Sequence, residues 1–236
     1  MTDDGRKLPA APGRTEVKDF IAKVRAMPQV RAAGTTGRLL FALDATASRE
    51  PTWDRAAKIQ GEMFSVAEAI GGLSVQLAWY RGFGELEASP WVSDSKALVA
   101  RMTQVRCAAG ETQIGKVLHH AIAETKRQRI NAVVFIGDCL EEPIDPLCGL
   151  AGELGLLGVP VFIFHEGGEA VARRGFEQIA HLTKGAYCPF DAGSADALRD
   201  LLAAVAAFAA GGRKALADLG AKRGGAALLL ARRLES

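Results

Sequence analysis

The chain has 236 residues, of which 49% are hydrophobic and 24% are charged, so it can bury a core and does not have the composition of a disordered protein. Its 29 basic and 27 acidic residues leave a formal net charge of +2, which argues against a dedicated nucleic-acid-binding protein. The polar amino terminus lacks the apolar stretch of a secretory signal, and the longest aliphatic run, Leu201 to Ala210, has about half of the ~20 residues that cross a bilayer, so no transmembrane segment is expected.

Apolar runs and helical periodicities alternate along the chain. In chain order they predict a short helix that opens at 15–19 and ends before Pro28, a strand at 38–44, a helix at 53–70, strands at 73–80 and 85–88, helices at 95–102 and 112–126, a strand at 130–137, a helix at 143–157, a strand at 159–164, a helix at 169–183, a short strand at 186–188 and a helix at 194–210. Three segments follow from this pattern: an amino-terminal extension (1–35), one folded domain (36–210) and a helical carboxyl-terminal tail with a basic side (211–236).

The strands are short and nearly all apolar, which is typical of central strands covered on both faces. The alternation predicts an α/β fold: a doubly wound, mostly parallel, Rossmann-like sheet with helices on both faces and one antiparallel edge strand at 85–88. Ligands of such sheets bind beyond the carboxyl ends of the strands.

The four cysteines (Cys107, Cys139, Cys148 and Cys188) include no CxxC pair. We expect buried thiols in a reducing compartment, the bacterial-type cytoplasm, rather than disulfides or a zinc site.

Oxygen donors gather at the ends of predicted strands. Asp44, Thr46 and Ser48 follow the first core strand on one tight loop, Thr112 lies just past Gly110, and Asp138 closes the third core strand. Two carboxylates and three hydroxyls are hard donors, and they favour Mg²⁺ or Mn²⁺ over zinc.

This set resembles the metal-ion-dependent adhesion site (MIDAS) of von Willebrand factor type A (VWA) domains. The family pattern is an Asp-x-Ser-x-Ser loop, a distant Thr and a distant Asp. Here these are Asp44-Ala45-Thr46-Ala47-Ser48, Thr112 and Asp138, with Thr46 in place of a serine. Each motif alone is weak, but the three occur in the family's order.

The resemblance implies a role for each residue. Ser48 and Thr46 would bind the ion through their hydroxyls, Thr112 directly or through water, and Asp44 and Asp138 mostly through water. An ion with few carboxylate ligands takes a Glu or Asp carboxylate from a partner protein. The resemblance thus implies a Mg²⁺-dependent adaptor, similar to bacterial cytoplasmic VWA proteins, some of which work alongside chaperone-like ATPases.

Several alternatives stay open. Asp44 and Thr46 could merely cap a helix, and the site could be vestigial in a structural subunit. Residues 110–117 imitate a phosphate-binding loop, but Val117 stands where that motif needs a hydroxyl and no apolar strand precedes it. A metal-dependent phosphohydrolase would use the same ion. An aspartate-nucleophile phosphatase needs a second carboxylate two residues after the nucleophile, where this chain has Thr46, so that alternative is disfavoured. Because the sequence offers no nucleophile–base pair, a non-enzymatic module is the preferred interpretation.

Overall fold

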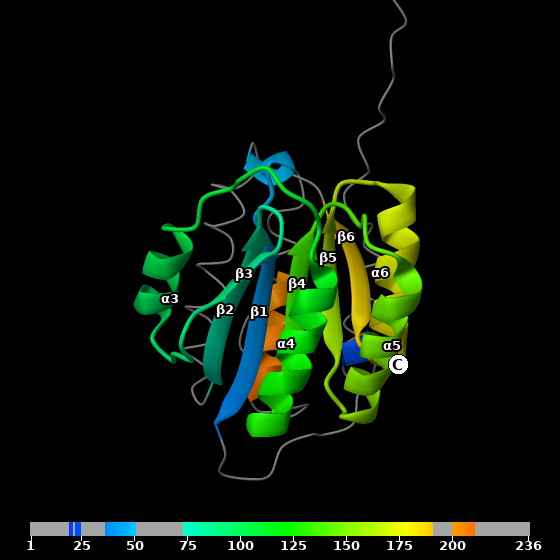
Figure 1. Cartoon of the computed structure of the whole chain (residues 1–236). Coiled ribbons are helices and arrows are strands. Elements are labelled where there is room, and N and C mark those ends of the chain that lie inside the picture. Colours follow the sequence, from blue (N-terminus) through cyan, green and yellow to red (C-terminus); the bar gives the residue numbers. More distant parts are fainter. Residues whose placement is uncertain (1–18, 21, 25–35, 51–72, 191–199, 211–236) are drawn as a thin grey trace, which may run out of the picture.

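The computed structural model describes residues 19–20, 22–24, 36–50, 73–190 and 200–210 (Figure 1). These residues build a six-stranded sheet with the order β3-β2-β1-β4-β5-β6. Every neighbouring pair is parallel except β2 and β3, which form an antiparallel hairpin at one edge. The strands are β1 (Gly37–Asp44), β2 (Leu73–Arg81), β3 (Glu85–Ala88), β4 (Ala132–Gly137), β5 (Val161–Glu166) and β6 (Ala186–Phe190).

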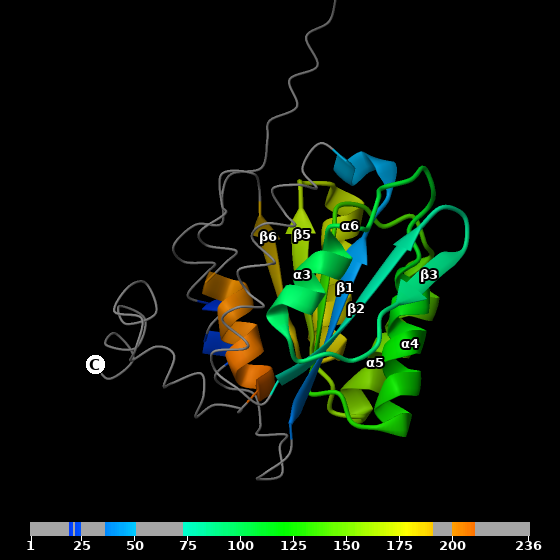
Figure 2. The same cartoon turned by 90° about the vertical axis from the view of Figure 1, so that its left-hand side faces the viewer.

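Helices cover both faces of this sheet (Figure 2). One face carries α4 (Ile114–Arg127), α5 (Ile144–Leu156) and α6 (Ala170–Leu182). The other carries α3 (Ser95–Met102) and the helical residues 200–210. A short 3-10 helix, η1 (Ala47–Arg49), follows β1. The predicted doubly wound fold with one antiparallel edge strand is therefore confirmed.

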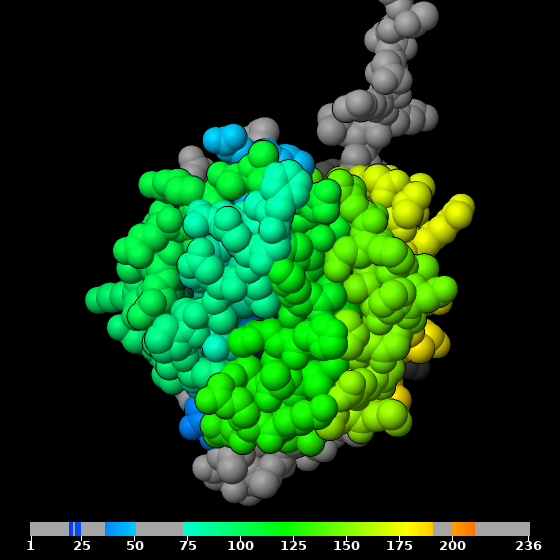
Figure 3. All heavy atoms as spheres, viewed as in Figure 1, coloured from blue at the N-terminus to red at the C-terminus, as the bar shows by residue number. Residues whose placement is uncertain are grey.

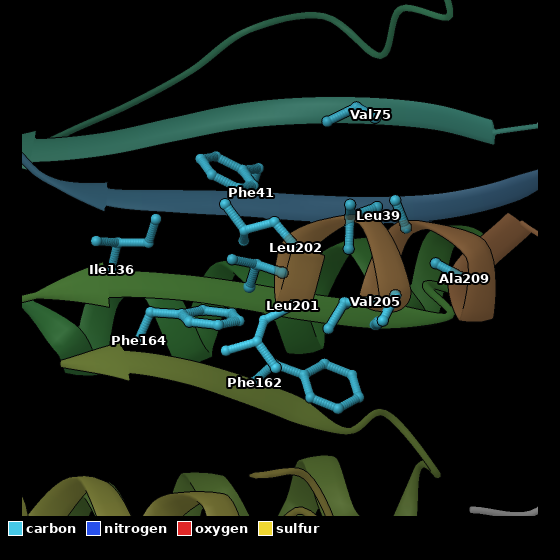
Figure 4. Close-up of a cluster of buried hydrophobic side chains, with 14 of the residues drawn as sticks. Leu39, Phe41, Val75, Ile136, Phe162, Phe164, Leu201, Leu202, Val205 and Ala209 are labelled. Carbon is cyan, nitrogen blue, oxygen red and sulfur yellow. The ribbon is translucent and has the colours of Figure 1, made fainter. Parts of the chain in front are cut away.

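The core consists of two apolar layers, one on each face of the sheet. In β1, Leu39 and Phe41 face one layer while Leu40 and Ala42 face the other, and all four side chains are fully buried. This two-sided burial is why the strand reads as a continuous apolar run rather than an alternating one. Figure 4 shows the first layer, in which the side chains of residues 201–209 lie against Phe41 and the phenylalanines of β5.

Most predicted elements begin and end within two residues of the observed ones, and α3 matches its prediction. The last strand is longer than expected, because β6 continues from Cys188 to Phe190 beside β5. Helix α4 begins at Ile114, two residues later than predicted. The helix expected at 53–70 lies outside the described residues, as do most of the amino-terminal extension and the whole tail.

All four cysteines are free thiols. The expectation that they are buried holds for Cys188 alone. Cys107 and Cys139 lie in loops at the edge of the sheet and Cys148 lies on α5, and these three are half-buried. Burial still raises the pKa of Cys107 to about 11. Among the described helices, none combines the length and the hydropathy that crossing a bilayer demands.

Candidate metal centre

The candidate site lies where β1 and β4 end side by side. Leu43 pairs with Ile136 in the parallel register, which places Asp44 beside Gly137 and brings Asp138 to the same edge. A Cβ atom built on Gly137 would lie 3.4 Å from the Cβ of Asp44, so the two chains approach closely here. The topology thus brings the two predicted carboxylates together.

Asp44 is fully buried and organises its own loop. Its Oδ1 accepts hydrogen bonds from the amide of Thr46 at 2.8 Å and from the Thr46 hydroxyl at 2.6 Å. The Thr46 and Ser48 hydroxyl oxygens are 3.0 Å apart. Three oxygens of the predicted loop therefore meet at one point. The Thr46 side chain makes no capping hydrogen bond to η1, and the helix expected at 53–70, which these residues could cap, lies outside the described residues.

Tyr80 holds the second oxygen of that carboxylate. It is the register partner of Asp44 on β2, and its hydroxyl donates to Asp44 Oδ2 at 2.9 Å. Burial, and then the negative charge of Asp44, raise the pKa of Tyr80 well above its usual value, so the phenol keeps its proton and remains a donor. Sequence analysis missed Tyr80, and only the parallel register of β1 and β2 identifies it.

The electrostatic balance disfavours a charged Asp44. Burial is the largest cause that raises its pKa, and the charge of Asp138 adds to it, whereas hydrogen bonds from Thr46 and Tyr80 act the other way. Among the described residues, no lysine or arginine forms an ion pair with Asp44 or Asp138. A bound cation would supply the missing positive charge.

Asp138 leaves one of its oxygens without any partner. Its Oδ1 is buried and makes no hydrogen bond in the described structure. Its backbone carbonyl, in contrast, accepts from Nε2 of His165 at 3.1 Å, and the other ring nitrogen of His165 accepts from the hydroxyl of Tyr187 at 2.9 Å. His165 is fully buried, and burial lowers its pKa, which favours the neutral ring that donates to the carbonyl and accepts from the hydroxyl. The loop is thus held firmly while one carboxylate oxygen stays unused.

Thr112 reaches the same edge through the loop before α4. Its amide donates to Glu141 Oε2 at 2.9 Å, and its hydroxyl accepts from the amide of Glu141 at 2.9 Å. The neighbouring Glu142 accepts from the amides of Ile114 and Gly115, the first residues of α4. Glu142 thus caps α4, whose preceding residue Gln113 makes no capping hydrogen bond. Burial raises the pKa of Glu142, and the hydrogen bonds from the amides of Gly115 and Ile114 only partly offset this.

This cap also bears on the phosphate-loop imitation at residues 110–117. The amides that a phosphate would need already bind Glu142, and no strand lies between α3 and this loop.

Arg49 ties the strand ends together beneath the loop. It is nearly fully buried, and its guanidinium donates to the carbonyl oxygens of Asp44 at 3.1 Å and Ile136 at 3.4 Å. It also binds Glu166, the last residue of β5, at 2.7 Å. A charged residue in a polar loop gives no sequence signal for such burial, and sequence analysis missed it.

The donor set fits a hard cation. In the described part of the chain, no group of three or more His, Cys, Asp or Glu side chains is placed to hold a metal ion. A site here would therefore depend on hydroxyls, and Thr46, Ser48 and Thr112 lie with Asp44 and Asp138 at one edge of the sheet. The unused Asp138 oxygen and the buried Asp44 carboxylate fit Mg²⁺ or Mn²⁺, which prefer oxygen ligands.

No family model matches the chain, and no curated protein matches it. Several solved structures do match the chain. The SpRpn10 VWA domain is 14% identical, with a TM-score of 0.56, over 70% of this chain and 95% of that chain. An aerotolerance-related membrane protein from Bacteroides fragilis is 15% identical, with a TM-score of 0.56, over 70% of this chain and 98% of that chain. A von Willebrand factor type A protein from Catenulispora acidiphila is 16% identical, with a TM-score of 0.59, over 73% of this chain and 43% of that chain. At such identities the likeness shows the fold.

Proposed function

We propose that this chain, which has the fold of a von Willebrand factor type A domain, is a Mg²⁺-dependent protein-binding module. VWA domains commonly mediate protein–protein interaction. In this proposal the ion lies at the Asp44–Asp138 edge of the sheet, and a partner protein completes its shell with a Glu or Asp carboxylate. Mn²⁺ is the alternative ion, and a chaperone-like ATPase is one class of partner.

One observation carries the proposal: the buried, unpartnered Oδ1 of Asp138 beside the buried carboxylate of Asp44. Burying a carboxylate without a counter-charge is costly, and proteins normally pair such groups or use them to bind metals. No described lysine or arginine forms an ion pair with either aspartate, since the nearby Arg49 is paired with Glu166, whereas the buried Glu124 elsewhere in the fold has its ion pair. A divalent cation would compensate both charges at once.

The chain's own residues then have distinct roles. Thr46, Ser48 and Thr112 would hold the ion through their hydroxyls, while Asp44 and Asp138 would orient its waters and balance its charge. Mg²⁺ keeps an octahedral shell with several waters, so one exchangeable position suits an incoming carboxylate. Tyr80 and Thr46 keep Asp44 oriented before the ion arrives.

Binding is preferred over catalysis because the proposal assigns the carboxylates at this edge to the ion and its waters, and the histidine beside Asp138 is not free to accept a proton. His165 is fully buried and both of its ring nitrogens are engaged. A phosphohydrolase that uses the same ion is the competing function.

Capture of proteins from a bacterial lysate by the immobilised full chain, in Mg²⁺ or in EDTA, tests the proposal. We expect partners that are retained in Mg²⁺, released by EDTA and lost with Thr46→Val, which removes a hydroxyl with little change of shape. Thr125→Val is the matched control, because the buried Thr125 hydroxyl has no hydrogen-bond partner in the described structure and lies on α4 away from the site. Retention unaffected by EDTA and by Thr46→Val would contradict the proposal. Turnover of phosphate esters that Thr46→Val abolishes would favour the hydrolase.

A further inference from the structure

Phe83 lies in the turn between β2 and β3, with 79% of its surface exposed. Among the described residues, the large hydrophobic side chains with comparable exposure are Leu156 (92%) and Val171 (62%). Single exposed apolar side chains are ordinary at protein surfaces, so exposure alone indicates nothing. What distinguishes Phe83 is how its turn is held and where it lies.

The turn that presents Phe83 is fixed on both sides. Gly82 and Gly84 have φ angles of +61° and +105°, which side chains other than glycine rarely adopt. The loop before α4 packs directly on this turn, since a Cβ on Gly110 would lie 2.2 Å from the Gly82 carbonyl oxygen. The side-chain amide of Gln113 donates to the carbonyls of Arg81 and Gly82, both at 3.1 Å. The turn therefore cannot easily fold over to bury the ring.

The same loop belongs to the candidate metal centre. Glu111 donates its amide to the Gly82 carbonyl at 3.2 Å, and the next residue is Thr112. The β2–β3 turn, which contains Phe83, thus lies at the end of the sheet where η1 and the carboxyl ends of the parallel strands lie (Figure 1). In Figure 3 the β2–β3 hairpin and α4 form one continuous surface.

A positive charge accompanies the ring. The ammonium group of Lys116, on α4, donates to the carbonyl of Gly84. No described carboxylate forms an ion pair with Lys116, and its side chain is exposed. Glu85 and Glu87 of the hairpin are ion-paired with Arg81, so an acidic segment would gain a favourable charge contact at Lys116.

We propose that Phe83 and Lys116 form an apolar and cationic subsite beside the metal centre. Its occupant is a partner segment that carries a large apolar side chain next to the Asp or Glu that binds the ion. Aromatic side chains supply much of the binding energy at many interfaces. The proposal rests on the proposed function, and it adds the chemistry of the partner's neighbouring residues.

Selection of a displayed random peptide library against the full chain in excess Mg²⁺ tests this subsite. The selected peptides are expected to contain an acidic residue close to a large apolar one. Phe83→Ser is expected to bind a selected peptide about tenfold or more weakly, as loss of an interface hot spot does. Leu156→Ser is the matched control, because Leu156 is also strongly exposed but ends α5 just before β5 begins, at the opposite end of the strands from the β2–β3 turn. Equal thermal stability of the two variants verifies that both fold.

The remaining outcomes separate the two proposals. Peptides that need Phe83 but tolerate EDTA and Thr46→Val would support the subsite and contradict the metal-dependent function. Peptides that need the metal but bind Phe83→Ser normally would overturn the subsite and leave the function standing. Failure to enrich apolar residues, or self-association of the chain that Phe83→Ser abolishes, would also overturn it, the latter in favour of a second copy as the occupant.

Discussion

Buried charged groups occur at both ends of the sheet, but they differ in their ion-pair and hydrogen-bond partners. At the end where β1 begins, Arg38 and Glu124 form a buried ion pair at 3.0 Å. Glu124 also accepts from the indole of Trp91 at 2.7 Å and from Arg127 at 3.0 Å. The Arg38 guanidinium lies 3.8 Å from the centre of the Trp91 ring and donates to the carbonyl of Gln128. This cluster is complete within the chain.

At the end where β1 finishes, Arg49 and Glu166 also form an ion pair, but no described lysine or arginine is paired with Asp44 or Asp138. Asp44 is held by neutral donors, and Asp138 keeps a buried oxygen that makes no hydrogen bond in the described structure. The comparison teaches that burial of charge is not itself a sign of a binding site. The Glu124 carboxylate is fully paired within the chain, whereas Asp138 keeps an unpartnered oxygen, which a divalent cation would bind in the proposed function.

Removal of Glu124 should have the largest effect. Glu124→Leu leaves Arg38 buried without its counter-charge, and we expect the free energy of unfolding to fall by about 3 kcal/mol in urea denaturation. Glu177→Leu is the control, because it removes an exposed ion pair with Arg173 and should change stability by about 0.5 kcal/mol or less. Equal effects of the two substitutions would mean that the complete cluster does not stabilise the fold.

Lowering the pH should remove part of the stabilisation that Glu124 contributes to the folded state. Burial alone would raise the pKa of Glu124, but the bond from Trp91 and the charges of His120 and Arg38 outweigh it and lower the pKa. A lowered pKa in the folded state means stability that is present above the ordinary glutamate pKa of about 4.3 and is lost as the pH falls through the folded value. The stability difference between the natural chain and Glu124→Gln should therefore shrink on acidification. A difference that stays constant to pH 3 would contradict this.

Removal of the charge at Asp138 should have the smallest effect on the free energy of unfolding, and any change should be a slight increase. In EDTA, Asp138→Asn removes a charge that disfavours ionised Asp44 and breaks no side-chain hydrogen bond of Oδ1. We expect the free energy of unfolding to stay within about 1 kcal/mol of the natural chain, or to rise slightly. A loss of several kcal/mol would show that Asp138 is a structural residue like Glu124.

Local patterns were sufficient for much of the fold. The apolar runs predicted the central strands, because each of these is buried on both faces, whereas the exposed edge strand β3 was predicted as the return after the turn at 81–84. The start of α4 was misplaced since the carboxylate that caps it belongs to Glu142, from a distant loop. The Asp44–Ser48 loop is a local motif and was predictable. Tyr80 and Arg49 were not, because their roles follow from strand register and from burial of a charge that sequence patterns place at the surface.

The most direct test is the stability of the EDTA-treated full chain on addition of Mg²⁺. At about a hundred times the dissociation constant, the ion should raise the free energy of unfolding of the natural chain by about 2.7 kcal/mol. The same addition should leave Asp138→Asn and Thr46→Val unchanged and should stabilise Thr125→Val like the natural chain. Absence of any stabilisation by Mg²⁺ or Mn²⁺, or equal stabilisation of all four proteins, would contradict a metal centre at this edge.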